Sequence, residues 1–518
     1  MHQKTISSAL AAALAAVTLA ACSGGGATTD VAAGEAPKDI TLAVRNDVDT
    51  FDPALSAYEN GASQVYEALY DTLIRIDLKS GEYVPAIASS WKNTPTRAEF
   101  VIKENLTCSD GSPLKPSDVA ASIERLADPS TGSVLTGRMF GAAGVKSVVA
   151  DDQAHTLAIE LKGPHIDMLD GLRSAFIICP SGLADTEKLA TVPAGSGPYR
   201  LTSSTRGDSY VLERWDSPAV EEDASLPERI TMKVVTADST RANLFETDAA
   251  DIVSIVGRDA ARLTKEHEPI KGRANGTESL MFNQRPGRPG ADPEVRRIIA
   301  QAVDAEGYAK AASFGVADPI RTMLSPTMEC YDESNEQHTL PFDAAAAKAA
   351  LADAGYGPGG KPLSVIVVGM ESQNSGPEYL AEALRDIGID VEVKNGSLAQ
   401  LVAIVYEERE PWDLVVFPMI SEARSPFPMV TKTSSNLGEG GSYNYGRITN
   451  AQYDALVERV AGEDGDQRCA TWSEAEKSLL TRHDVVPLLW STAAYFSKDL
   501  EFDAGYRVLN LRTIRAKG

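Results

Sequence analysis

The sequence is poor in positive charge. Its 518 residues contain 49 Lys and Arg against 73 Asp and Glu, which gives a formal net charge of −24. Nucleic-acid binding requires clustered Lys and Arg side chains along the phosphates, so we expect no nucleic-acid partner. The apolar run at about 9–21 is too short and too rich in Ala for a transmembrane helix. With 43% hydrophobic and 24% charged residues, the chain instead has the composition of a folded soluble protein.

Cysteine is also scarce, and its spacing excludes a zinc site. The sequence has five Cys, and no two of them lie two to four residues apart. Structural zinc sites use pairs at that spacing, so we predict no metal.

Motifs of catalysis and nucleotide binding are incomplete. GYGPGGK (355–361) fits G-x-G-x-x-G and the start of a P-loop, but it follows an expected helix, and Pro362 replaces the required Ser or Thr. Ala194 stands where a G-x-S-x-G nucleophile elbow needs Gly, and His267-Glu268 lacks the second His of H-E-x-x-H. We therefore predict a protein that is not an enzyme, with no catalytic residues and no cofactor.

The N-terminus has the pattern of an export signal. Lys4 precedes the apolar run, which ends in Leu19-Ala20-Ala21-Cys22 and resembles a bacterial lipobox. We expect residues 1–21 to be a lipoprotein signal peptide, Cys22 to carry the lipid, and 22–37 to form a flexible tether. The alternative is an ordinary signal peptide that is cleaved nearby.

Hydrophobic periodicity predicts a mixed α/β protein. We expect strands at 40–45, 100–103, 156–162, 209–215, 229–235, 363–369, 389–394 and 412–418. We expect helices at 63–74, 116–128, 292–312, 377–388 and about 397–409. The order strand, helix, strand after residue 363 is typical of an α/β domain.

A series of segments, in order and at similar spacing, resembles the oligopeptide/dipeptide-binding family (family 5) of ABC-transporter solute-binding lipoproteins. In the first half these are VDTFDPALS, YEALYDTLIRID, PAIASSW, FVIKENLTCSDGSPLKPSDVAASIER and GSGPYRL. In the second half they are NLFETDAADI, LMFNQRPGRPGADPEVRRIIAQAVD, FDAAAAKAALADAGY, ALRDIGIDVEV, WDLVVFP, ITNAQYDALV and HDVVPLLW. The resemblance covers about residues 40–500.

This resemblance implies a two-lobed periplasmic-binding-protein-like clamp with a third, accessory lobe. The expected division is lobe I at 38–83, 200–284 and 487–518, the accessory lobe at 84–199, and lobe III at 285–486. Four Cys remain after Cys22, and an exported protein with an even number of Cys is expected to form disulfides. Sequence order alone allows three pairings, whereas the implied lobes favour Cys108 with Cys179 and Cys330 with Cys469.

The resemblance also implies a ligand site between lobes I and III. In the family's peptide binders an Asp that follows a Trp pairs with the ligand ammonium; here Met419 matches the Trp and Glu422 the Asp, which puts peptide specificity in question. A solvated loop is the alternative for Glu422, and a plain surface charge is the alternative for Arg424. The residues expected to contact ligand are Tyr58, Asn283, Met419, Ser421, Glu422, Arg424, Tyr445 and Trp490. Tyr443, Tyr445 and Trp490 would line pockets for ligand side chains, and packing in the core is the alternative for all three.

The function implied is that of a monomeric, extracytoplasmic receptor, lipid-anchored to the outer face of the cell membrane or periplasmic. It would bind a peptide or another small molecule and deliver it to the membrane permease of an ABC importer. Two alternatives stay open: a same-family receptor for a metal chelate, an opine-like compound or a glycoside, and a secreted hydrolase that has kept the clamp.

Overall fold

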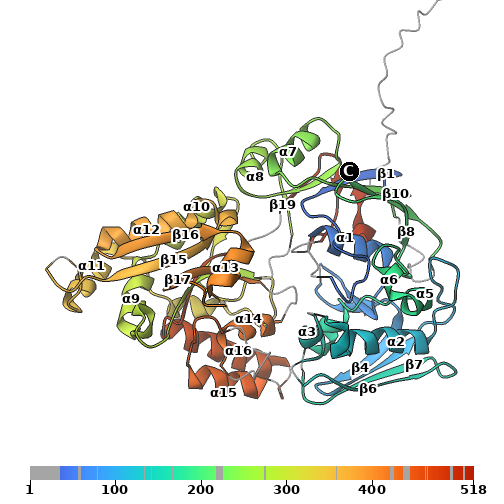
Figure 1. Cartoon of the computed structure of the whole chain (residues 1–518), viewed down its shortest axis with the longest axis horizontal. Helices are drawn as coiled ribbons and strands as arrows, with labels where there is room; N and C mark the ends of the chain where they lie inside the picture. The colour runs from blue at the N-terminus through green and yellow to red at the C-terminus, as the bar shows by residue number, and fades with distance from the viewer. Residues whose placement is uncertain are drawn as a thin grey trace, which may run out of the picture.

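The computed structural model describes residues 36–56, 60–78, 80–133, 135–141, 143–165, 167–217, 226–272, 276–357, 359–405, 407–420, 425–435, 444–460, 462–463, 465–490, 494–505 and 508–517. Within these residues the chain forms three larger sheets, each with its own helices (Figure 1). The predicted signal peptide, Cys22 and nearly all of the predicted tether lie outside the described residues.

Lobe I is built on a seven-stranded sheet of order β12-β19-β11-β1-β10-β9-β8. β1 is parallel to β10 and β11 and lies between them. Leu42 of β1 packs on one face with α1, while Ala43 packs on the other with α7 and α8. The strands are β1 Asp39–Val44, β8 Tyr199–Thr205, β9 Ser209–Arg214, β10 Arg229–Val234, β11 Ile252–Ile255, β12 Ile270–Lys271 and β19 Ala494–Phe496, and the helices are α1 Asn60–Leu69, α7 Asp238–Glu246 and α8 Gly257–Leu263.

The accessory lobe has a four-stranded antiparallel sheet of order β4-β5-β7-β6. Along β5, Ala98, Phe100 and Ile102 are buried and alternate with exposed residues, so one face packs on α2 and the other meets solvent. The elements are β4 Ala88–Thr94, β5 Arg97–Ile102, β6 Val145–Asp151, β7 Thr156–Leu161, α2 Pro116–Ala127, α3 Thr136–Phe140, α4 Met168–Leu172, α5 Pro180–Ala184 and α6 Thr186–Leu189. A two-stranded ribbon, β2 Ile74–Ile76 with β3 Tyr83–Pro85, leads into it, and β20 Leu500–Glu501 pairs with β21 Arg515–Ala516 near the C-terminus.

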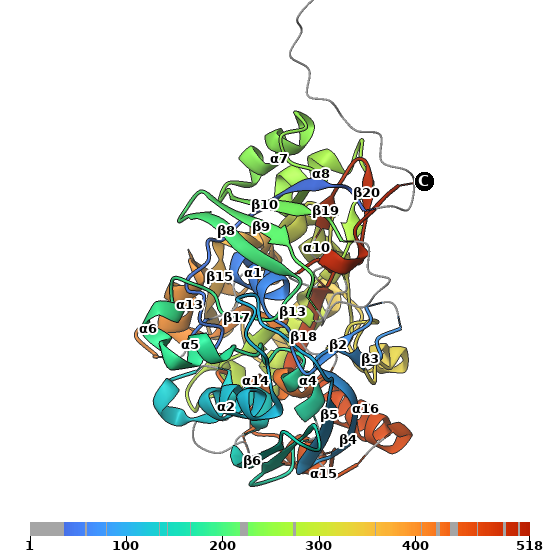
Figure 2. The same ribbon diagram turned by 90° about the vertical axis from the view of Figure 1, so that its right-hand side faces the viewer.

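Lobe I and the accessory lobe share one hydrophobic core. Leu42 and Val65 of lobe I belong to the same cluster of buried side chains as Phe100 and Ile123 of the accessory lobe. Figure 2 shows the sheet of lobe I above that of the accessory lobe. Because separating them would expose this core, we expect the two lobes to move as one unit.

Lobe III has a six-stranded sheet of order β14-β18-β13-β17-β15-β16, covered by helices on both faces. Leu280 packs on the face of α9, α11 and α12, and Met281 packs on the face of α15 and α16. Within the described residues, no cluster of buried residues includes members from both lobe III and the rest of the protein. The strands are β13 Gly276–Phe282, β14 Asp318–Pro319, β15 Ser364–Met370, β16 Asp390–Gly396, β17 Leu414–Ile420 and β18 Val485–Trp490, and the helices are α9 Pro293–Ala302, α10 Ala305–Ser313, α11 Ala344–Asp353, α12 Gly376–Ile387, α13 Leu398–Val405, α14 Phe427–Thr433, α15 Ala451–Val460 and α16 Gly465–Thr481.

The structure places two boundaries of lobe III differently from our expectation. β13 and β18 pair with each other inside its sheet, although residues 276–284 and 487–490 were assigned to lobe I. Both strands are largely buried on two faces, so their sequences alone suit either sheet. The chain therefore passes between the lobes twice, between β12 and β13 and between β18 and β19.

Two predicted helices also differ from the structure. The helix expected over 292–312 is two helices, α9 and α10, because Val303 is extended and the Asp304 side chain accepts a hydrogen bond from Glu306 N at the start of α10. The helix expected over 63–74 ends at Leu69, whose carbonyl oxygen accepts a hydrogen bond from Gly197 N.

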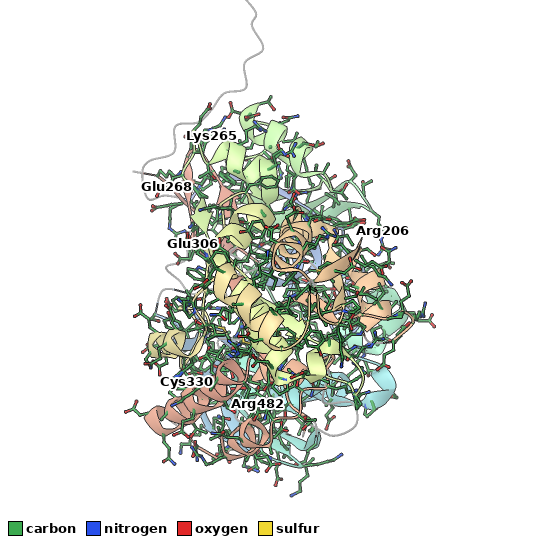
Figure 3. All side chains as sticks on the ribbon, turned by 90° about the vertical axis from the view of Figure 1, so that its left-hand side faces the viewer. Arg206, Lys265, Glu268, Glu306, Cys330 and Arg482 are labelled. Atoms are coloured by element: carbon green, nitrogen blue, oxygen red, sulfur yellow. A yellow bond between two sulfur atoms is a disulfide. The ribbon has the colours of Figure 1, made fainter. Side chains whose placement is uncertain are left out.

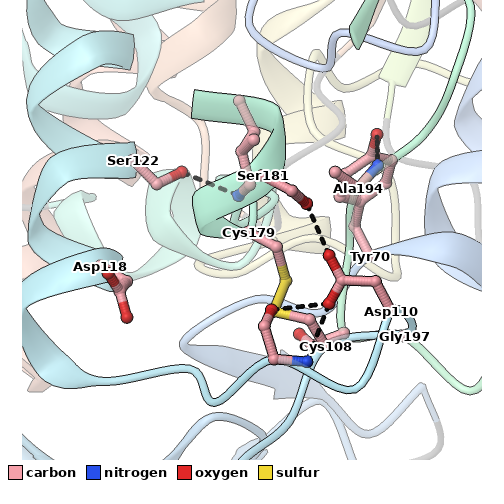
Figure 4. The surroundings of a disulfide bond; sticks show 12 residues. Tyr70, Cys108, Asp110, Asp118, Ser122, Cys179, Ser181, Ala194 and Gly197 are labelled. Carbon is pink, nitrogen blue, oxygen red and sulfur yellow. Dashed lines mark hydrogen bonds between the residues drawn. A yellow bond between two sulfur atoms is a disulfide. The ribbon is translucent and has the colours of Figure 1, made fainter. Parts of the chain in front are cut away.

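Both predicted disulfides form. Cys108 is bonded to Cys179 in the accessory lobe, and Cys330 is bonded to Cys469 in lobe III. Figure 4 shows the first of these, beside Asp110, which accepts hydrogen bonds from the hydroxyls of Ser112 (2.6 Å) and Ser181 (2.8 Å). In Figure 3, which faces lobe III, Cys330 is labelled in the lower half and Glu306 of α10 above it.

Candidate ligand-binding site

One edge of the lobe III sheet faces lobe I and collects the ends of several strands. Gly276, at the start of β13, is opposite Ile420 at the end of β17, and the next residue, Thr277, is opposite Trp490 at the end of β18. β15 and β16 are parallel to each other, and β15 is parallel to β17, so their carboxyl ends lie at this edge too. Ligands of open α/β sheets bind beyond the carboxyl ends of the strands, which makes this edge the candidate site.

On the side of lobe I, two buried tyrosines hold the segment that precedes Tyr58: Tyr66 of α1, and Tyr70, which directly follows α1. Tyr66 Oη donates to Thr50 O and Tyr70 Oη donates to Phe51 O, both at 2.6 Å. Burial raises the pKa of both phenols above the usual range, so they stay protonated and keep these donors. Tyr58 itself lies outside the described residues.

Three of the predicted ligand residues are packed inside lobe III. Met419 is 0% exposed, in the core with Phe417, and the ring of Tyr445 packs against Phe417 with centroids 5.0 Å apart. Asn283 is 2% exposed and follows the far end of β13, where its side-chain amide donates to Trp412 O at 2.9 Å. These contacts give the three residues structural roles. The alternation of Val415, Phe417 and Met419 along β17 was the signal that they share the core face.

Trp490 is the predicted ligand residue that the structure leaves at the lobe I edge with part of its surface exposed. The remaining predicted contacts Tyr58, Ser421, Glu422 and Arg424 lie outside the described residues. The described neighbours of the 421–424 segment are Ile420, at this same edge, and Ser425.

Sequence reasoning missed a partly buried carboxyl group near the edge, that of Glu278 of β13. Its Oε2 accepts hydrogen bonds from Tyr308 Oη (3.2 Å) and Gln373 Nε2 (3.3 Å). Burial raises the pKa of Glu278 to about 7, against the lowering effect of these two hydrogen bonds. The available signal was an acidic residue within a strand, GTESLMF, whose other side chains carry no charge.

Lobe III touches the other two lobes on two sides, and its partly buried Val316 packs against the lobe I cluster that includes α7 and α8. Near the strand connections, Arg258 of α8 lies over the ring of Phe314 at 5.6 Å, and Lys271 Nζ is 3.4 Å from Asp318 Oδ2. On the other side, Asp167 of the accessory lobe accepts hydrogen bonds from Ser425 and Arg468 of lobe III.

The described residues contain neither a candidate metal site nor a candidate membrane-spanning helix. No cluster of three or more His, Cys, Asp or Glu there could hold a metal ion. No helix in the described part is long and apolar enough to cross a membrane.

The chain is similar to known binding proteins over most of its length. It is 24% identical over 493 residues to the periplasmic murein peptide-binding protein MppA of Escherichia coli, covering 87% of each chain. A substrate-binding protein of Microbacterium hydrocarbonoxydans, solved with 4-hydroxybenzoate hydrazide, is 25% identical with a TM-score of 0.74, covering 93% of this chain and 100% of that one. NikA of Brucella suis, solved with Fe(III)-EDTA, is 20% identical with a TM-score of 0.80, covering 92% and 100%.

These likenesses confirm the two-lobed binding-protein fold that the sequence landmarks implied. A family model described as bacterial extracellular solute-binding proteins, family 5, middle region, matches residues 82–440, which is more than half of the chain. The chain therefore belongs to the bacterial extracellular solute-binding proteins of family 5.

Proposed function

We propose that this protein is the receptor of an ABC importer, which captures a peptide-like solute between lobe I and lobe III and delivers it to the permease. The observation that carries the proposal is the arrangement of two units with separate cores, joined by two strand connections, with the carboxyl edge of the lobe III sheet between them. Such a hinge closes on ligand when some ligand contacts exist only with both units together. The closed form then docks on the permease.

Recognition of a peptide would combine main-chain hydrogen bonds with charge pairing at its ends. Glu422, in the segment that follows β17, would neutralise the ligand ammonium, with Ser421 beside it, and Arg424 would bind a carboxylate. Tyr58 would contribute from lobe I and Trp490 would line a side-chain pocket. For Glu422 the competing interpretation is a solvated loop carboxylate.

The proposed place of action is outside the cytoplasm. Lipidation of Cys22 would anchor the chain, with 22–37 as the tether, and the receptor would act as a monomer. The family is one of solute-binding proteins, and a relative from Sinorhizobium fredii is described as a probable peptide ABC transporter periplasmic-binding protein, which favours a receptor over the hydrolase alternative.

A non-peptide solute is the second candidate, and one observation favours it. Met419 stands at the position expected for the aromatic residue of peptide binders, and it is buried in the core. Two of the structural neighbours above were solved with ligands that are not peptides, a hydrazide and a metal chelate.

Identification of the ligand that co-purifies with the protein separates the two candidates. The mature chain would be purified without denaturation and examined by native mass spectrometry, with a denatured and refolded sample as the empty control. We expect an added mass that fragments as a short peptide. An added mass with no peptide fragments would overturn the peptide proposal in favour of the second candidate.

A further inference from the structure

A buried polar bridge joins the accessory lobe to lobe III. Asp167 accepts a hydrogen bond at Oδ2 from Ser425 Oγ (2.6 Å) and another at Oδ1 from Arg468 Nη2 (2.7 Å). Arg468 Nη1 is also 3.5 Å from Glu329 Oε2. We call Asp167, Ser425, Arg468 and Glu329 the Asp167 bridge. Because the accessory lobe shares its core with lobe I, this bridge connects the two units of the clamp.

The burial of Asp167, Arg468 and Ser425 distinguishes the bridge from an ordinary surface ion pair, while Glu329 at its edge is 40% exposed. The side chains of Asp167 and Arg468 are 8% and 13% exposed, and Ser425 is 2% exposed. Exposed ion pairs contribute little, whereas removal of one partner from a buried pair leaves the other charge uncompensated. Burial raises the pKa of Asp167 to about 6, against the lowering effect of Arg468 and Ser425, and the nearby Asp170 and Glu329 raise it further.

Asp167 is oriented away from its usual local role. It is the residue before the first turn of α4, where an Asp side chain normally accepts a hydrogen bond from the N–H groups of its own helix. Its side chain makes no such bond and reaches lobe III instead. The lost helix cap indicates that this position is used for the contact between lobes.

On the side of lobe III, a disulfide fixes the two charged members. Arg468 directly precedes Cys469 in the first turn of α16, and Glu329 directly precedes Cys330, to which Cys469 is bonded. The disulfide therefore holds the guanidinium and the second carboxylate near each other before the lobes meet.

The third member of the bridge, Ser425, is next in sequence to proposed ligand residues. Ser425 directly follows the segment 421–424, which contains Glu422 and Arg424. The hydrogen bond from Ser425 to Asp167 thus holds Ser425 against the accessory lobe when the two units are together.

We propose that Asp167 is a positioning residue for ligand capture, which locks the closed clamp through its hydrogen bonds with Ser425 and Arg468. The accessory lobe is then a working part of the clamp. This inference rests on the proposed function for its effect on affinity, because a contact that exists only in the closed form and a ligand that binds only the closed form stabilise each other. The lock itself does not depend on which ligand is bound.

The lock is tested without ligand by the distance between the units. Spin labels would be placed at the exposed positions Val149 of the accessory lobe and Glu382 of lobe III through Val149→Cys and Glu382→Cys in the full mature chain. Asp167→Ala should shift the distance distribution, measured by pulsed electron resonance, toward longer values than in the parent. Asp167→Asn loses the charge but keeps groups that can accept from Arg468 and bond Ser425, and Glu329 remains near Arg468, so it should shift the distribution less than Asp167→Ala. Asp152→Ala, which removes an exposed carboxylate of the same lobe, is the matched control and should change nothing.

The effect on affinity is then measured with short synthetic peptides by calorimetry. Asp167→Ala should weaken the tightest of them by at least about tenfold, and Asp167→Asn should weaken it less. If Asp167→Ala keeps the parent distance distribution, the lock is overturned. Lower stability with unchanged distances is the result expected when Asp167 has only a structural role. If Asp167→Ala fails to fold, Ser425→Ala decides by the same two measurements, and unchanged distances overturn the proposal. A parent that binds no peptide contradicts the proposed function, while the distances still decide the lock.

Discussion

Arg125 of the accessory lobe holds Asp52 of lobe I in a two-pronged ion pair. Nη1 lies 3.0 Å from Oδ1 and Nη2 lies 2.5 Å from Oδ2. Asp52 is fully buried, and Oδ1 also accepts a hydrogen bond from Ala54 N. The pair therefore fixes the FDPALS segment, which precedes Tyr58, to the accessory lobe.

Removal of the buried carboxylate should be costly. We expect Asp52→Asn to lower the free energy of unfolding by about 3 to 5 kcal/mol, because Arg125 is left without its counter-charge. Glu99→Gln, which breaks the exposed pair of Glu99 with Arg97, should cost less than about 1 kcal/mol. Urea unfolding of both variants checks this, and equal losses would contradict the assigned role of Asp52.

The two disulfides should differ in their effect on the distance between the accessory lobe and lobe III. Replacement of either pair by Ser should lower stability by roughly 4 kcal/mol, since each closes a long loop. Loss of Cys330–Cys469 should in addition lengthen the distance between accessory lobe and lobe III, because it frees Arg468 and Glu329. Loss of Cys108–Cys179 should leave that distance unchanged. Spin-label distances in the two double variants provide the test, and equal distances would show that the disulfide does not organise the bridge.

Glu278 should make stability depend on pH near neutrality. Its pKa is raised from 4.5 to about 7 by burial, so the folded protein holds a proton that the unfolded chain has released. Its stabilising contribution is full below pH 4.5 and is lost as the pH rises through 7, a change of about 3 kcal/mol. Glu278→Gln keeps the shape and should flatten the profile between pH 5 and 8. Thermal unfolding across this range measures it, and an equally steep profile in the variant would assign the effect to another group.

The membrane anchor has its own test. Cys22→Ala removes the residue that would carry the lipid, so the variant should be found in the soluble fraction or remain unprocessed. Fractionation of cells that express each form checks this, and an unchanged, membrane-attached mature variant would contradict lipidation at Cys22.

Much of the fold could be predicted from sequence because it depends on local patterns. Alternation in ITLAVR and the stripe of Val295, Ile298 and Ile299 specify a strand and a helix without knowledge of their partners. The assignment of β13 and β18 failed for the opposite reason: both strands are largely buried on two faces, so only their hydrogen-bond partners show which sheet they join.

The candidate site was harder to predict because position in a family pattern does not fix the direction of a side chain. Met419 aligns with a ligand-contacting position, yet the two-residue period of β17 turns it into the core. In the Asp167 bridge, Asp167 and Arg468 are 301 positions apart in the sequence and belong to different units. No local pattern in the sequence indicates such a contact.

The most direct test of the account is a calorimetric titration of the parent protein and of Glu422→Gln with short peptides, each used with a free and with an acetylated amino terminus. The parent should bind the free-amine peptides at least about tenfold more tightly than the acetylated ones. Glu422→Gln should remove this preference, and the empty variant should keep the thermal stability of the parent. No binding of any peptide by the parent would contradict the central claim that this receptor captures peptide-like solutes.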